Sequence, residues 1–134
     1  MMKAKSIAWS EIPVGKPKIS KKKVSFTTSG GIRFSAGIVR EYDLSKKLRV
    51  KAFLRHDSES TSIGFMFLET GEPNSLKVGH NAKNNTCSFS GISIFREAGF
   101  DYKNAGVRVF EPNVEKYNGQ TLFVVEIKSE VKQL

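Results

Sequence analysis

The stretch IRFSAGIVREYDL (residues 32–44) and the stretch CSFSGISIFREAGF (residues 87–100) decide the fold. With one inserted residue they align, because both carry Phe-Ser, then an apolar segment, then Arg-Glu. Similar residues recur after both stretches at a spacing of about 55 to 60 residues, which indicates an internal repeat. The sequence therefore predicts two related halves, residues 24–70 and 74–128.

Each half has the pattern of a β-β-α-β-β unit. In the first half we expect strands at 24–28, 32–34, 48–54 and 63–68 and a short helix at 36–42. In the second half the corresponding segments are 76–78, 86–89, 107–111 and 122–127, with a helix at 91–98. Ser35 and Ser90 stand at the expected helix N-caps, and residues 63–67 align with 122–126 in hydrophobic character. The polar, turn-rich segments 56–61 and 112–120 are expected to be linkers.

The fold class that follows is mostly β. A half of roughly 50 residues would bury little core alone. Two halves can complete each other into one small closed barrel, which removes exposed strand edges. We therefore expect a single domain over residues 24–134, with about eight strands and two short helices.

Basic residues concentrate before this domain. The formal net charge of the chain is +9, and residues 1–23 hold seven lysines against Glu11 alone. Pro13, Gly15 and Pro17 interrupt any helix here, so we expect a flexible basic arm. Such an arm acts either as a solubilising tail or as a phosphate-binding arm, since lysine runs bind nucleic acid without reading sequence.

Several functional classes lack support in the sequence. No apolar run is long enough to cross a membrane, no secretory signal is visible, and the single cysteine fits a reducing, cytoplasmic compartment. The chain has neither a Walker phosphate loop nor a GxGxxG motif, and His56 and His80 lack the spacing of a metal site. We therefore expect no enzyme and no cofactor, and we interpret Cys87 as a buried small hydrophobic residue.

The aromatic residues are expected mainly in the core. The alternative is a stacking platform for single-stranded nucleic acid. Trp9 lies in the basic arm, where it would either anchor the arm on the barrel, which we prefer, or contact a ligand. The phenylalanines on apolar strand or helix patterns are Phe26, Phe34, Phe53, Phe65, Phe67, Phe89, Phe95, Phe110 and Phe123.

The motif of residues 31–35, followed by Arg40-Glu41, Leu44 and the strand 47–50, resembles the AbrB/MazE/SpoVT swapped-hairpin family. The resemblance covers roughly residues 24–68 and, more weakly, 76–128. It implies a cradle-loop barrel, which two chains usually build and which this chain would build from its two halves. It also implies DNA binding by basic residues near the first hairpin. By position those residues are Arg33, Arg40, Arg49, Arg96 and Arg108.

The chain departs from the family pattern at three places. Residues 45–47 replace a glycine-aspartate turn, Ser35 replaces a proline, and Ser88 stands at the counterpart of Arg33. Together with the charge pattern, the resemblance predicts a non-enzymatic nucleic-acid-binding protein, with DNA favoured over RNA and no membrane partner. The alternative is a protein-interaction or structural subunit, and a homo-oligomer stays open. The predicted phosphate-binding residues are Lys16, Lys18, Lys21, Lys22, Lys23, Arg33, Arg40, Lys47, Arg49, Lys51, Arg55, Arg96 and Arg108.

Overall fold

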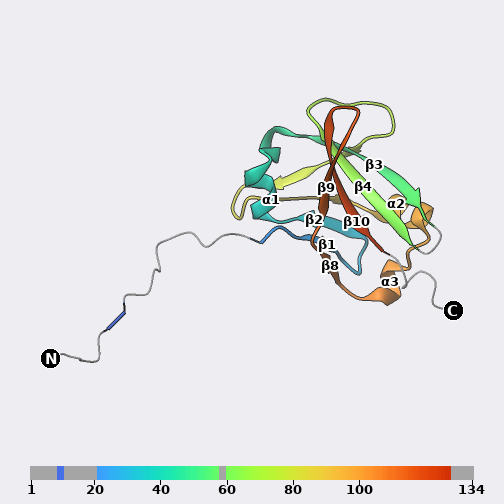
Figure 1. The fold of residues 1–134 in the computed structure, drawn as a ribbon, viewed down its shortest axis with the longest axis horizontal. Helices are drawn as coiled ribbons and strands as arrows, with labels where there is room; N and C mark the ends of the chain where they lie inside the picture. Colours follow the sequence, from blue (N-terminus) through green and yellow to red (C-terminus); the bar gives the residue numbers. More distant parts are fainter. Residues whose placement is uncertain (1–8, 11–20, 58–59, 128–134) are drawn as a thin grey trace.

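Two five-stranded antiparallel sheets form the body of the protein (Figure 1). The structure, a computed structural model, describes residues 9–10, 21–57 and 60–127. The first sheet, here sheet A, has the order β6(Gly79–Asn81), β7(Thr86–Ser90), β2(Gly31–Phe34), β1(Val24–Phe26), β8(Arg108–Phe110). The second, sheet B, has the order β5(Leu76–Lys77), β3(Arg49–His56), β4(Thr61–Leu68), β10(Gln120–Glu126), β9(Asn113–Tyr117). The mostly-β prediction is thus confirmed.

Short helices follow two strands of sheet A: one pair leads from β2 to β3 of sheet B, and the other lies between β7 and β8 of sheet A. The helix α1(Ala36–Glu41) and the 3-10 helix η1(Leu44–Lys46) follow β2, and α2(Ile92–Ala98) and α3(Tyr102–Ala105) follow β7. The helices expected at 36–42 and 91–98 are therefore confirmed to within one residue at each end.

The main core lies between the inner faces of the two sheets. Its centre is the ring of Phe34, which contacts the rings of Phe65, Phe67 and Phe123 from sheet B at centroid distances of 4.9 to 5.6 Å. Seven of the nine phenylalanines expected in the core are buried, while Phe53 and Phe110 are half-buried. The alternating apolar residues of the strands therefore unite both sheets in one core.

At two points the chain passes from one sheet to the other almost without interruption. Only Val78 separates β5 from β6, and its amide donates to the carbonyl of Leu48 at 2.9 Å. Only residues 111–112 separate β8 from β9. The hydrogen-bonded ladders nevertheless fall into two sheets, so closure into a single barrel stays a prediction.

The two segments that decided the fold lie side by side. Strands β2 and β7 pair antiparallel, with Ile32 opposite Phe89, Arg33 opposite Ser88, and Phe34 opposite Cys87. The two hairpins β1–β2 and β6–β7 thus meet at the centre of sheet A through the strands that carry the Phe-Ser pairs.

Some local expectations were wrong. The expected linker 112–120 contains β9, and the described residues form ten strands rather than eight. The N-cap of α2 is Gly91 and not Ser90. Position 91 favours glycine because a Cβ there would come within 2.6 Å of the Ile32 side chain. The aligned residues 63–67 and 122–126 are one residue out of phase, because Ile63 faces the main core whereas its counterpart Leu122 faces away from it.

Candidate nucleic-acid interface

The outer face of sheet A carries a positive charge that has no partner among the described residues. One residue from each of its five strands contributes to a row of cross-strand neighbours, which in strand order are Gly79, Ser88, Arg33, Ser25 and Val109. None of these five residues is buried, whereas the residues that alternate with them along β1, β2 and β7 pack into the core. The result is a row of small or uncharged side chains with one arginine at its centre.

No carboxylate opposes this arginine within the sheet. The five strands of sheet A contain no aspartate or glutamate, whereas β9 and β10 of sheet B each contain a glutamate. In the described part of the chain, no side chain forms a hydrogen bond or ion pair with the Arg33 guanidinium. This charge is therefore available to an anion from outside.

Lysines extend the charge along the same face. Lys23 aligns with Ser35 at the end of the β1–β2 ladder, and the Ser35 amide donates to its carbonyl at 2.9 Å. The Ser35 hydroxyl accepts from the Lys23 amide at 2.9 Å and donates to the Lys21 carbonyl at 2.7 Å. Ser35, predicted as a helix cap, makes no side-chain cap bond and instead holds the end of the basic arm against β2.

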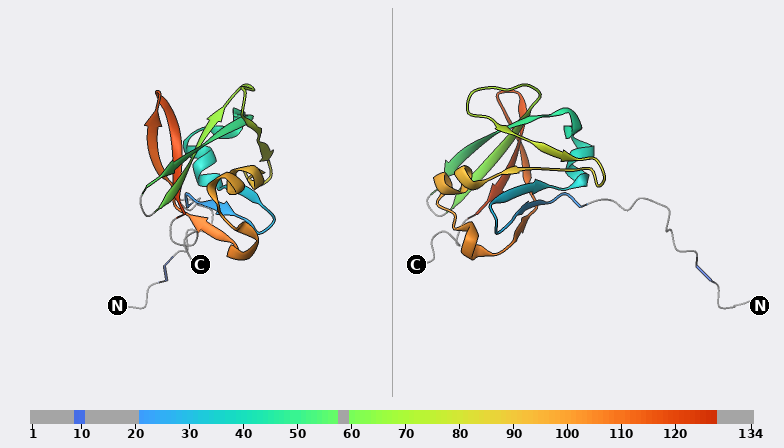
Figure 2. Two further views of the ribbon diagram at one scale, coloured as in Figure 1. Left: turned by 90° about the vertical axis from the view of Figure 1, so that its right-hand side faces the viewer. Right: turned by 180° about the vertical axis from the view of Figure 1, so that it is seen from behind.

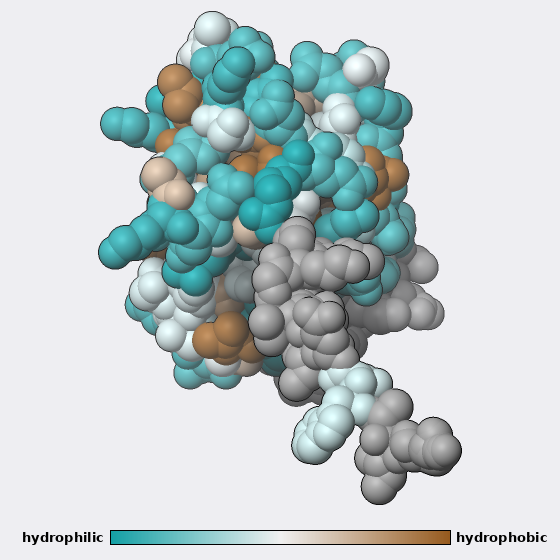
Figure 3. All heavy atoms as spheres, turned by 90° about the vertical axis from the view of Figure 1, so that its left-hand side faces the viewer, coloured by the Kyte–Doolittle hydropathy of each residue, from teal (hydrophilic) through white to brown (hydrophobic). Residues whose placement is uncertain are grey.

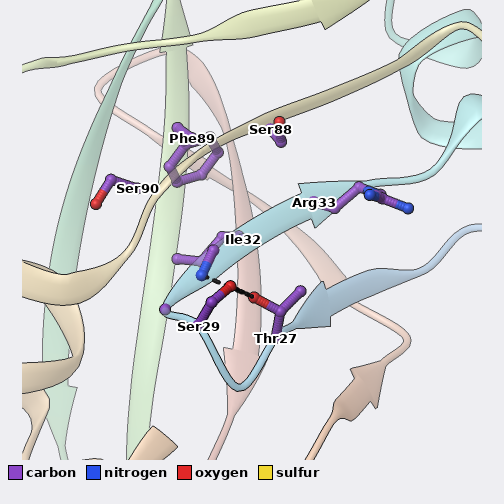
Figure 4. Close-up of a pocket in the computed structure, with 9 residues that line it drawn as sticks. Thr27, Ser29, Ile32, Arg33, Ser88, Phe89 and Ser90 are labelled. Carbon is purple, nitrogen blue, oxygen red and sulfur yellow. Dashed lines mark hydrogen bonds between the residues drawn. The ribbon is translucent and has the colours of Figure 1, made fainter. Parts of the chain in front are cut away.

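A shallow concavity of about 490 Å³ lies on this face beside Arg33 (Figure 4). Hydroxyl groups line it: Ser88 lies on the strand next to Arg33, and Thr27 and Ser29 lie in the β1–β2 turn with their oxygens 3.1 Å apart. The Thr27 hydroxyl also accepts from the Gly31 amide at 2.9 Å. Arginine, hydroxyl and backbone amide groups are the donors that proteins use toward phosphate oxygens.

The predicted cations of sheet B behave differently, because intramolecular partners engage them. Arg55 pairs with Glu115 at 3.2 Å, Lys51 with Glu72 at 3.0 Å, and Lys47 with Glu69 at 3.6 Å. Arg49 donates to the hydroxyl and the carbonyl of Ser75. The hydrogen bonds that Arg55 donates to the Glu115 carboxylate raise the pKa of Arg55. Lys47, Lys51 and Arg55, all predicted to bind phosphate, are thus offset by carboxylates that are distant in the sequence.

The remaining predicted residues are dispersed. Lys22 pairs with Glu41, whose hydrogen bond raises the Lys22 pKa. Arg40 and Arg96 are exposed on α1 and α2, and the half-buried Arg108 aligns with the inward-facing Phe26. Lys16 and Lys18 lie outside the described residues.

The cysteine and the two histidines have partners or surroundings within the fold. Cys87 is buried as predicted, and burial raises the pKa of its thiol to about 12. Imidazole nitrogens of His56 and His80 bond to the Thr61 hydroxyl and the Lys47 carbonyl. Among the described residues, no group of three or more histidine, cysteine or acidic side chains could hold a metal ion.

Two features of the surface bear on partners. Trp9 is 95% exposed, so the preferred prediction that it anchors the arm on the body was wrong. The face shown in Figure 3 is largely hydrophilic, with small and separate apolar patches. Within the described ranges, no helix has the length and apolar character to cross a membrane.

Comparisons of the chain with protein-family models, with curated proteins and with solved structures each return no match.

Proposed function

We propose that the chain is a non-enzymatic nucleic-acid-binding protein that holds the phosphate backbone on the outer face of sheet A. One observation carries this proposal: Arg33 lies exposed at the centre of a sheet whose strands contain no carboxylate. Lys21 and Lys23 extend the same positive face toward the basic arm. An anion on this face meets cations and hydroxyls without displacing an internal partner.

The chemistry of the face favours backbone contacts over base readout. The row across sheet A contains serine, glycine and valine around Arg33, and the row has no aromatic ring on which a base could stack. Phosphate contacts fix position on a nucleic acid and carry little sequence information. Binding should therefore be nearly blind to sequence and strongly dependent on salt.

Strand order supports the proposed family and barrel. Two ladders of the structure, β2–β7 and β4–β10, each join a hairpin of the first half to a hairpin of the second half. The nearly continuous pairs β5–β6 and β8–β9 join the edges of the two sheets. We propose that the chain is a swapped-hairpin barrel built from two repeats, and the preference for DNA follows from that resemblance.

The experiment is a titration of random duplex DNA at several salt concentrations. For duplex DNA, each neutralised phosphate adds about 0.9 to the slope of log K against log salt. We expect Arg33→Gln to lower the slope by about 1 and to weaken binding equally on all sequences. Lys116→Gln removes the same charge from β9, where the ammonium group bonds to Thr121, and should leave the slope unchanged.

Two outcomes would refute the proposal. One is the absence of DNA and RNA binding at low salt. The other is an equal effect of Arg33→Gln and Lys116→Gln on the salt slope, which would mean that binding depends only on the net charge of the protein.

A second candidate function, a subunit that binds another protein, is favoured by the edge strand β8. Val109 on this strand is 56% exposed, and Val107 just before it is 63% exposed. In sheet A, β8 pairs only with β1, so its other edge is open to a further strand within the described fold. Sedimentation of wild type and Val109→Lys tests this candidate, because an assembly built through this edge would dissociate in the variant.

A further inference from the structure

A second small core lies on the outer side of sheet B, away from the main core. It consists of four residues that are each at most 7% exposed and that pack with Phe53 of β3. These residues are Met66 and Leu68 on β4 and Leu122 and Val124 on β10. Residues on the outer face of a sheet are buried only if something covers them. The cover here is the sheet itself.

Sheet B curls so strongly that its outer strands touch. Strands β4 and β10 lie between β3 and β9, so a flat sheet would hold β3 and β9 about 14 Å apart. Instead, the ring centroids of Phe53 on β3 and Tyr117 on β9 are 5.2 Å apart, and Arg55 bonds to Glu115. Figure 2 (left) shows the β3–β4 and β9–β10 hairpins crossing and then diverging.

A cleft of about 230 Å³, here the hairpin cleft, lies between these hairpins. Phe53 and Tyr117 line it, and Gly64, Leu122 and Val124 form its apolar surface. Drug-sized sites occupy about 300–1,000 Å³, and an apolar cavity of about 150 Å³ accepts benzene. The hairpin cleft thus has room for two fused aromatic rings.

One polar group faces this apolar space without a partner. Ser62 on β4 lines the cleft and is only 5% exposed, the one polar residue buried among the described residues. No described residue hydrogen-bonds to its hydroxyl. The hydroxyl oxygen itself keeps some solvent-accessible surface, so a ligand that displaces solvent from the cleft can form a hydrogen bond with it.

We propose that the hairpin cleft binds a small planar aromatic molecule that carries one hydrogen-bonding group. The rings of Phe53 and Tyr117 pack against its flat body, and the Ser62 hydroxyl bonds to its polar atom. The Arg55–Glu115 pair closes the rim above it. Ligand pockets commonly combine this apolar lining with a few placed polar groups.

The test is an NMR titration of the full chain with indole and with indene, which has the same shape without the N–H. We expect saturable shifts at the amides of Gly64, Leu122 and Val124 with both probes. Indole should bind about fivefold more tightly than indene, because only indole bonds to Ser62. In Ser62→Ala this preference should disappear, while in the matched control Ser88→Ala, on sheet A, it should persist.

Three results would overturn the proposal: no saturable shift at the cleft with either probe, shifts located on another surface, or equal binding of indole and indene by wild type. The comparison of two probes on wild type keeps the test decisive if Ser62→Ala does not fold.

Discussion

The buried thiol of Cys87 makes the stability of the fold depend on alkaline pH. Cys87 lies on the inner side of β7 opposite Phe34, and burial raises its pKa from 9.0 to about 12. Below pH 9 the thiol is neutral in both states and has no effect on the free energy of unfolding. Above pH 9 the unfolded chain loses this proton while the folded chain retains it, so stability falls as the pH rises toward 12.

The size of the effect follows from the interval above the unfolded pKa. At pH 11, which is 2 units above 9.0, the thiol should lower the free energy of unfolding by about 3 kcal/mol. Urea unfolding of wild type and Cys87→Ala at pH 8, 9, 10 and 11, with a reductant present, measures it. Lysine and tyrosine titrate in both proteins, so subtracting the two profiles isolates the thiol. Parallel profiles would refute the burial of Cys87.

Three further substitutions test the packing. Gly30→Ala should cost more than Gly106→Ala in thermal unfolding, because both have positive φ but only a Cβ at Gly30 would meet another side chain, at 2.6 Å. In urea unfolding, Phe34→Ala should lower the free energy of unfolding by about 3–5 kcal/mol in a single transition, and Phe53→Ala should lower it clearly less. Two separate transitions for Phe34→Ala would contradict a shared core. Ser35→Ala should cost about 1 kcal/mol and expose the Lys23 amide to hydrogen exchange; unchanged exchange at this amide would contradict the tether.

Much of the secondary structure could be predicted because its signals are local. Alternation of apolar residues located β1, continuous apolar runs located β4 and β10, and the short apolar segments after the Phe-Ser pairs located α1 and α2. The strand β9 was missed although Asn118-Gly119 marks its turn. Both residues have positive φ, as a tight hairpin turn requires, and Asn-Gly is the strongest short hairpin signal.

Which cations are available could not be predicted from local patterns. Arg55 and Glu115 are 60 residues apart and meet only because sheet B curls. The bonds of Arg49 to Ser75 similarly depend on the loop that precedes β5. The basic residues of β3 are therefore paired within the fold, while Arg33, with no other basic residue within its strand, has no partner among the described residues.

The positive charges of the two sheets differ in whether they have partners within the fold. On sheet B, Arg55 and Lys51 bond to carboxylates within the fold, so a phosphate there would have to break an existing pair. Exposed pairs of this kind are weak and salt-sensitive, but breaking one still subtracts from the gain of binding an external anion. On sheet A, Arg33 has no such competitor. A net charge of +9 alone therefore does not locate a binding surface; the location follows from which strands carry carboxylates.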